Sequence, residues 1–483
     1  MQRTAVAAVA LLICTSCGET YRPVANPITP NPPNPGFSHV AMVLSSNGNN
    51  NPGAGTTIDV SGDTAVSQAA LGLVPSYAIL SSNSSKAWVT NSLDDTVSQF
   101  SPSNPTPVTT ISLPTGSAPA FAGTAENGAV YVANSGNNTV SVIAVFTNAV
   151  SNTVPVGAAP IALAETPAIP GGQPQKIYVA NQGGSVSVVS SVDKTAGFVP
   201  GAWVSPVWVS ARSDANRVYV LDSGAGTVSA IDTASDTVVG SSAAVGTGAN
   251  FMAYDSARNR LYVTNQASSV LSIVDVSNDL LSVTPLSVAN PVAVAILPPN
   301  GSRVYVASAV VSGGNVASRV IVVDAARETI KTTIPLATVA QSCASTRFEL
   351  SVAASADGTR VYVGNCDAGN TSIIQTSTDT IVTNLPAPLS AIQPSALKIT
   401  AALQSGTTTI YTYTPVSGPP LRLGMTMVVE NLQKTVDNGT FAIVGLGTGT
   451  FTVVNPGGVT LSGQSGTGTG LTPQNPVLVV AGS

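Results

Sequence analysis

Short apolar runs separated by turns rich in Gly, Asn, Asp and Ser recur along most of the chain. In the run from Arg217 to Leu221, consecutive Val, Tyr and Leu residues make both faces of the segment apolar. A strand with two apolar faces must be covered on both sides. The segments Val204 to Ser210, Thr227 to Ile231 and Thr237 to Val239 flank this run and also read as strands. The pattern predicts a unit of four antiparallel strands that stacks against similar units.

The second strand of this unit is repeated along the chain. Near-copies of Tyr219-Val220-Leu221-Asp222 begin at Trp88, Tyr131, Tyr178, Tyr262, Tyr305 and Tyr362. The steps between the seven aromatic residues are 43, 47, 41, 43, 43 and 57 residues. A period in the forties built from short strands is typical of a β-propeller, in which each four-stranded unit is one blade.

The two ends of the repeated region complement each other. His39 to Leu44, Thr57 to Val60 and Thr64 to Ser67 read as second, third and fourth strands without a first strand. Asn475 to Gly482 reads as a first strand that nothing follows. We therefore predict an all-β propeller of eight four-stranded blades, closed by a composite blade from both ends of the chain. A ring of seven blades, with the N-terminal strands packed against it, is the alternative.

Residues 396–472 break the period and predict a separate module. Five short strands with Gly-rich turns are expected there, at Ile399 to Leu403, Thr408 to Thr414, Met425 to Glu430, Gly439 to Val444 and Gly449 to Val454. They are enough for a small β-barrel or sandwich. The expected propeller therefore spans residues 37–395, with 473–483 as its closing strand. Two lesser insertions are expected to lengthen a hairpin, at Glu165 to Gln175, and a loop, at Ser308 to Ser318.

The N-terminal residues read as a targeting segment. Arg3 supplies a positive charge, Ala5 to Ile13 is a short apolar run, and small residues follow, so residues 1–16 are expected to be a signal peptide. Nine apolar residues are too few to span a bilayer as a helix. Residues 17–36 contain six prolines and no apolar period, which predicts a semi-extended tether.

The composition supports this interpretation and excludes other classes. Charged residues make up only 8% of the chain and hydrophobic residues 43%, with 43 Gly and 34 Pro. This is the balance of a strand-and-turn protein with an uncharged polar surface, and not of a helical or disordered chain. The formal net charge is −5, and Lys and Arg form no cluster, so we expect no nucleic-acid partner.

Two segments resemble known families. The Tyr-Val-Thr-Asn-type second strands, with their Thr-Val-Ser-Val-Ile-type third strands, resemble the YVTN β-propeller repeat family of secreted and cell-surface proteins over about residues 75–389. That resemblance implies a toroidal scaffold. Ile13 to Gly18 resembles a bacterial lipoprotein signal, although Cys14 stands where that family prefers Leu. The second resemblance implies that Cys17 is the lipid attachment site; an ordinary cleaved signal is the alternative.

Residues with catalytic potential are sparse. The single histidine, His39, lies beside the tether, which argues against a catalytic triad, a multi-histidine metal site or a haem ligand. Glu165, Asp255 and Glu349 are the acidic residues on or next to the expected first strands, and a divalent cation needs several converging oxygen ligands. We predict no catalytic residue, metal or other cofactor. The other candidate acids are expected to cap outer turns, namely Asp232, Asp236, Asp275, Asp279, Asp324 and Asp379.

Two cysteines remain beyond the N-terminal segment. Cys343 precedes the first strand of the last repeat and Cys366 ends its second strand, so both are expected at the same end of one hairpin. We predict a disulfide between them, in keeping with an oxidising compartment. Two buried free thiols are the alternative.

These observations favour a lipid-anchored protein of the bacterial cell envelope. Its non-catalytic propeller would bind an envelope protein or a glycan through the Ser-, Thr- and Asn-rich loops of one face. Two alternatives remain. One is a propeller hydrolase of the lactonase type, and the other is a structural component of a surface layer.

Overall fold

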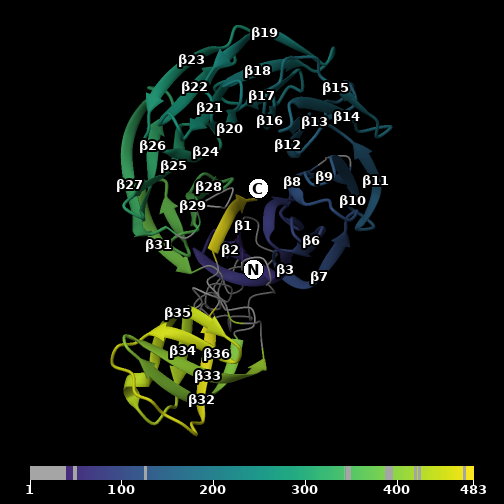
Figure 1. Cartoon of the computed structure of the whole chain (residues 1–483). Helices are drawn as coiled ribbons and strands as arrows, with labels where there is room; N and C mark the ends of the chain where they lie inside the picture. Colours follow the sequence, from purple (N-terminus) through teal and green to yellow (C-terminus); the bar gives the residue numbers. More distant parts are fainter. Residues whose placement is uncertain are drawn as a thin grey trace, which may run out of the picture. The chain divides into compact units, whose positions relative to one another are not determined.

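The computed structural model describes residues 40–46, 52–124, 128–341, 343, 350–386, 395–417, 421, 426–471 and 475–482. These residues form eight four-stranded antiparallel sheets and one closed barrel. Figure 1 shows the eight sheets arranged as blades around a common centre. The fold is therefore an all-β propeller of eight blades with a separate barrel near the C-terminus, as predicted. Within the described residues, no helix is long and apolar enough to cross a membrane.

The first blade is composite, and it closes the ring. The C-terminal strand β38 (Asn475–Ala481) pairs with β1 (Val40–Ser46), which pairs with β2 (Pro52–Asp59), and β3 (Thr64–Leu73) is outermost. Met42 faces Val480 and Leu44 faces Leu478 in this antiparallel ladder. The two ends of the chain thus complete one sheet, which excludes the seven-bladed alternative.

The other blades follow in chain order, and we number them 2 to 8. From the inner to the outer strand, blades 2 to 4 are β4–β7 (Pro75–Leu80, Ala87–Asn91, Thr96–Ser101, Asn104–Ser112), β8–β11 (Pro119–Thr124, Ala129–Asn134, Thr139–Ala144, Ala149–Pro155) and β12–β15 (Pro160–Glu165, Lys176–Asn181, Ser185–Ser190, Ala196–Phe198). Blades 5 and 6 are β16–β19 (Pro206–Ala211, Arg217–Asp222, Thr227–Asp232, Thr237–Ala244) and β20–β23 (Ala249–Asp255, Arg260–Asn265, Val270–Asp275, Ser282–Ser287). Blades 7 and 8 are β24–β27 (Pro291–Ile296, Arg303–Ser312, Asn315–Asp324, Thr329–Ala340) and β28–β31 (Leu350–Ala354, Arg360–Asn365, Asn370–Gln375, Thr380–Pro386).

The repeated second strands form the core of each blade. In β17, the residues from Val218 to Leu221 are at most 1% exposed, because the neighbouring blades cover both faces of the strand. The aromatic residue of every copy is equally inaccessible: Trp88, Tyr131, Tyr178, Tyr219, Tyr262, Tyr305 and Tyr362 are among the largest fully buried side chains. The repeat that identifies the fold is therefore core packing.

The Ser308 to Ser318 insertion differs from its prediction as a loop. Here β25 and β26 continue as paired strands up to the Ser312–Asn315 pair, and β27 follows them to Ala340. Gly313 and Gly314, with φ of +58° and +79°, close the tight turn at the tip. The extra residues alternate in pattern, so that Ala309 and Val316 pack with Val292 in a small apolar cluster. This cluster explains why the insertion is a hairpin.

The C-terminal module is a barrel with strand order β32-β33-β36-β35-β34-β37. Its elements are β32 (Ser395–Ser405), β33 (Thr408–Ser417), β34 (Thr426–Glu430), the 3₁₀ turn η1 (Thr435–Asp437), β35 (Gly439–Gly447), β36 (Thr450–Val454) and β37 (Gly466–Leu471). The sequence predicted five of the six strands. It missed β37, whose Gly and Thr residues carry no apolar pattern. At Gly468 an added Cβ would lie 3.2 Å from side-chain atoms of Ile399 and Met427, so the strand closes the barrel by lying directly on its core.

Candidate functional site

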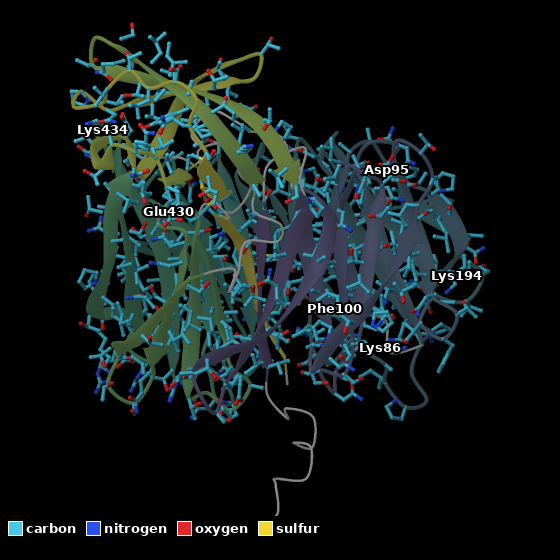
Figure 2. The ribbon with its side chains drawn as sticks, turned by 90° about the horizontal axis from the view of Figure 1, so that it is seen from below. Lys86, Asp95, Phe100, Lys194, Glu430 and Lys434 are labelled. Atoms are coloured by element: carbon cyan, nitrogen blue, oxygen red, sulfur yellow. A yellow bond between two sulfur atoms is a disulfide. The ribbon has the colours of Figure 1, made fainter. Side chains whose placement is uncertain are left out.

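The two faces of the propeller differ in charge. Each second strand runs from a lower face, where the first-to-second and third-to-fourth turns lie, to an upper face with the second-to-third turns and the connections between blades. Figure 2 shows Lys86, at the start of a second strand, near the lower edge and Asp95, in an upper turn, near the upper edge. In blades 4 to 8 the second strand begins with a basic residue at the lower face: Lys176, Arg217, Arg260, Arg303 and Arg360.

Each of these basic side chains pairs with an acid on the next blade. Arg217 of blade 5 donates two hydrogen bonds of 2.8 Å to Asp279 of blade 6, and one of 2.6 Å to Asp232 of its own blade. The equivalent inter-blade pairs are Lys176–Asp236 at 2.7 Å, Arg260–Glu328 at 3.3 Å, Arg303–Asp379 at 2.7 Å and Arg360–Asp63 at 2.8 Å. The lower face therefore carries a series of inter-blade ion pairs, one from each of blades 4 to 8 to the next.

These pairs correct part of the prediction for the outer-turn acids. Asp275 and Asp324 do accept hydrogen bonds from nearby backbone N–H groups, as expected. Asp236 and Asp379 instead bind side chains of the preceding blade. Both have φ of +55°, a left-handed conformation at the last position of the turn. The sequence signal for this role is a Lys or Arg two residues before the repeated Tyr, matched by an acid in the next unit.

Asp379 is the most enclosed acid of the series. Its side chain is 3% exposed and accepts hydrogen bonds from Arg303 at 2.7 Å, Lys331 at 2.6 Å and the Tyr305 hydroxyl at 2.6 Å. Burial, followed by the hydrogen bond to Asp379, raises the pKa of Tyr305. The phenol therefore stays protonated and acts as a hydrogen-bond donor. In blade 4 the Tyr178 hydroxyl donates to Asp236 in the same way.

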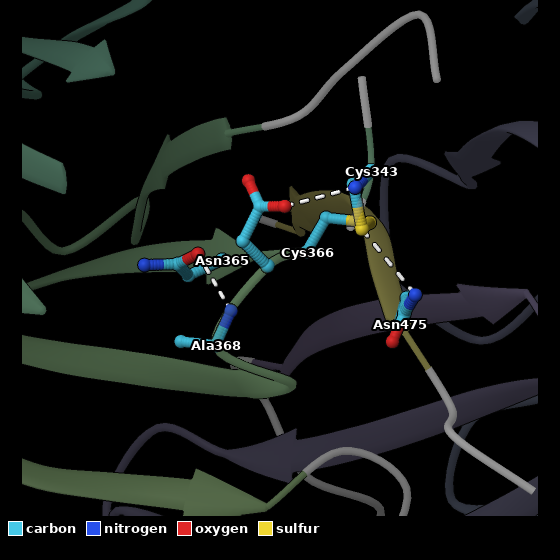
Figure 3. Close-up of a disulfide and its surroundings, with 6 residues drawn as sticks. Cys343, Asn365, Cys366, Ala368 and Asn475 are labelled. Carbon is cyan, nitrogen blue, oxygen red and sulfur yellow. Dashed lines mark hydrogen bonds between the residues drawn. A yellow bond between two sulfur atoms is a disulfide. The ribbon is translucent and has the colours of Figure 1, made fainter. Parts of the chain in front are cut away.

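The interface between blades 8 and 1 is where the ring closes. Arg360 and Asp63, 297 residues apart, form a bidentate pair at the lower face. Near the upper face, Cys343 and Cys366 are joined by a disulfide with a Cα–Cα distance of 6.0 Å. Figure 3 shows this bond beside Asn475 of the closing strand, whose side-chain amide lies 3.3 Å from the Cys343 sulfur. The Cys343 N–H donates to Asp367 at 2.8 Å. The disulfide thus holds Cys343 in place, and the closing strand β38 begins beside this residue.

Four aromatic side chains form an arc on the inner strands. Tyr77 stacks on Phe121 with ring centroids 3.8 Å apart, Phe121 meets Trp208 edge-on at 5.5 Å, and Trp208 lies 4.4 Å from Phe251. The arc skips blade 4, where the small Ala162 lets Phe121 and Trp208 approach each other. Phe121 and Trp208 are only 7% and 8% exposed. Tyr77 and Phe251 are partly buried and pack against the same core. The sequence analysis did not single out these four rings.

The turns and connections on the upper face of blades 3 to 6 contain no Asp, Glu, Lys or Arg. They consist of Gly, Pro, Ser, Asn, Gln, Thr and apolar residues, as in the turns 135–138, 182–184, 223–226 and 266–269. Exposed positions include Ala225, Ala267 and Ser268. The end of each second strand anchors these turns: Asp222 accepts backbone hydrogen bonds from Val204, Ser205 and Ala225, and Asn265 donates to the carbonyls of Val245, Gly246 and Thr247. The result is an anchored platform of hydroxyl and amide groups.

The Glu165 to Gln175 insertion shapes the lower face. It joins β12 to β13, and with the turns of blade 5 it lines a cleft of about 120 Å³. Lys176 and Asp214 are among the lining residues. Burial by itself raises the pKa of Asp214, but the hydrogen bonds from Arg212 and Asn216, together with the charge of Arg212, outweigh it and lower the value to about 2. The carboxylate at this cleft is thus ionised and paired.

The acids considered for a metal site do not meet. Glu165 ends β12 in blade 4, and Asp255 ends β20 in blade 6. The Asp255 side chain is 2% exposed, with Arg258 3.7 Å away, and burial raises its pKa. Across the described ranges, no group of three His, Cys, Asp or Glu residues is placed to hold a metal ion. Cys17, His39 and Glu349 lie outside the described residues.

Comparison with known proteins adds evidence on the fold. The chain is similar to AztD from Citrobacter koseri, with a TM-score of 0.53 and 10% identity over 72% of this chain and 95% of that one. It is also similar to the dihydro-haem d1 dehydrogenase NirN, with a TM-score of 0.52 and 13% identity over 72% of this chain and 73% of that one. At these identities, the similarity establishes the fold alone. No protein-family profile and no curated protein sequence matches the chain.

Proposed function

We propose that this chain is a lipid-anchored protein of the bacterial cell envelope whose propeller is a non-catalytic scaffold. In this proposal the upper face binds an envelope protein or a glycan, and Cys17 carries the lipid. The observation that supports it is the uncharged upper face of blades 3 to 6, with its anchored turns.

The chemistry of this platform suits such partners. Hydroxyl and amide side chains donate and accept hydrogen bonds without the desolvation cost of a charge, and peptides and sugars offer matching groups. The turns are already fixed by Asp222 and Asn265, so little ordering entropy is lost when a partner binds. Loops on a rigid scaffold are where binding residues concentrate.

A binding comparison tests the upper face. The bait is the Cys17→Ser chain, and the probes are a glycan array and a cross-linking capture from envelope extracts. We expect Ala225→Glu with Ala267→Glu to lower binding of the recovered partner by at least about tenfold, since each introduces an unpaired charge into the contact. Ala234→Glu with Ala326→Glu places the same charges at exposed lower turns. Equal binding by the two double variants would contradict the assignment of this face.

The lipid anchor has its own test. Cells producing the chain are fed labelled palmitate, and the parent is compared with Cys17→Ser. The proposal expects label on the parent and none on the variant. Label retained by Cys17→Ser would place the lipid elsewhere.

A further inference from the structure

The lower face carries strongly exposed apolar side chains at the tips of its turns. Phe146, between β10 and β11, is 91% exposed; Val192, between β14 and β15, is 71% exposed; and Leu280, between β22 and β23, is 74% exposed. These are the three most exposed large hydrophobic residues in the part of the chain that the structure describes. Ala234 and Ala326 are exposed in the equivalent turns of blades 5 and 7. The lower face thus presents apolar tips on five successive blades, and those of blades 5 to 7 stand in the turns that also carry Asp236, Asp279 and Glu328.

Lysines lie next to two of the three tips, Phe146 and Val192. The Lys86 amine donates to the carbonyl of Val145, the residue before Phe146, at 3.2 Å. The Lys194 amine, two residues after Val192, donates to the Tyr131 hydroxyl at 2.8 Å and lies 5.2 Å from the centre of that ring. At Phe146, the exposed aromatic tip beside an amine is the combination that favours the boundary between lipid headgroups and acyl chains.

The first described strand begins at the same face. The strand β1 begins at Val40, which pairs with Asp59, the last residue of β2 before the lower turn. The chain therefore enters the propeller, at Val40, on the lower face of blade 1. Blade 2 with Lys86 and blade 3 with Phe146 come next around the ring. A chain as long as residues 17–39 can reach up to about 80 Å, so the tether alone would not hold the ring against a surface.

From these observations we propose that the lower face of the propeller lies against the lipid bilayer, with Phe146 and Val192 reaching the boundary between the headgroups and the acyl chains. The proposal rests on the lipid anchor at Cys17, which supplies a high local concentration of membrane. The apolar tips and the two lysines supply the orientation that a loose tether cannot. The uncharged upper face of blades 3 to 6 then points away from the membrane, toward partners.

Fluorescence quenching by brominated lipids tests the orientation. The probe membrane is a vesicle of phosphatidylethanolamine and phosphatidylglycerol in which part of the lipid is brominated, and it carries the protein purified with its own lipid. If cells leave Cys17 unmodified, its thiol is coupled to a maleimide lipid instead, so failure of the natural anchor does not prevent the test. Phe146→Trp and Val192→Trp report on the lower face. Val311→Trp, 42% exposed on the β25–β26 hairpin at the upper face, is the matched control.

The added tryptophan at residue 146 or 192 is expected to be quenched at least about twofold more than the one at 311, because bromine quenches only groups that enter the acyl region. The three native tryptophans, Trp88, Trp203 and Trp208, are present in every variant and give the same background. Phe146 and Val192 stand in exposed turns, so both variants should fold. Equal quenching at 146, 192 and 311, or none at any of them, would overturn the proposal, whereas loss of palmitate labelling alone would count only against the natural anchor.

Discussion

Removing the charge of Asp379 should destabilise the propeller far more than the same change elsewhere among the ion pairs. Asp379 is 3% exposed and holds Arg303, Lys331 and Tyr305, so Asp379→Asn leaves two cations without their partner. Breaking a buried pair costs about 3–5 kcal/mol, but Arg303 and Lys331 are 24% and 43% exposed and regain water. We therefore expect a loss of about 2–3 kcal/mol in the free energy of unfolding.

Glu328→Gln is the matched control. Glu328 has the equivalent position in blade 7, but its side chain is 25% exposed and accepts from Arg260 at 3.3 Å. Its loss should cost less than about 1 kcal/mol, as for exposed ion pairs. Urea unfolding followed by tryptophan fluorescence measures both variants, since all three tryptophans lie in the propeller. Equal losses for the two variants would refute the argument that enclosure decides the strength of these pairs.

Three further predictions concern other parts of the chain. Burial raises the pKa of Asp255 in the folded protein above its pKa in the unfolded chain. The stability that the neutral carboxyl group contributes is therefore complete below the unfolded-state pKa, and it is lost as the pH rises from that pKa through the folded-state pKa. Asp255→Asn lacks this loss, and its stability relative to the parent should grow over that window in pH-dependent melting curves; a constant difference would contradict the burial argument. Opening the Cys343–Cys366 bond by double substitution with Ser should cost about 3 kcal/mol, measured as a lower urea midpoint, and an unchanged midpoint would be evidence against its role. Gly468→Val should cost about 1–3 kcal/mol of stability by crowding Ile399 and Met427, and it should be seen as an early loss of hydrogen-exchange protection in the barrel. Gly457→Ala should have no such effect, because a Cβ at residue 457 would have only one neighbouring atom, 4.0 Å away. Equal effects of the two substitutions would contradict the packing of β37.

The propeller could be predicted from the sequence because the same strand pattern occurs repeatedly along the chain. Seven copies of one strand, each apolar on both faces, require the same cover, and a unit such as that of Tyr219 can obtain it only from its neighbours. The composite blade was equally predictable, because the two ends lacked complementary strands. Missing strands leave a visible gap in a periodic pattern.

Features that depend on contacts between units were harder to predict. The aspartates of the outer turns have the same local sequence whether they cap their own backbone, as Asp275 does, or bind the previous blade, as Asp379 does. The strand β37 has no side-chain pattern because its glycines lie on the barrel core. The uncharged upper face of blades 3 to 6 and the apolar lower tips can be recognised in the sequence only after the blade topology has assigned each turn to one of the two faces.

A hydrogen-exchange footprint tests the central claim most directly. The Cys17→Ser chain is compared with and without the partner or glycan that it retains, and amide protection is mapped on every turn. We predict slower exchange in the upper turns 223–226 and 266–269 of blades 5 and 6, with no change at the lower turns that contain Ala234 and Ala326. Protection confined to the lower turns, or to the inner-strand ends at Glu165 and Asp255, would contradict a scaffold that binds through its upper face.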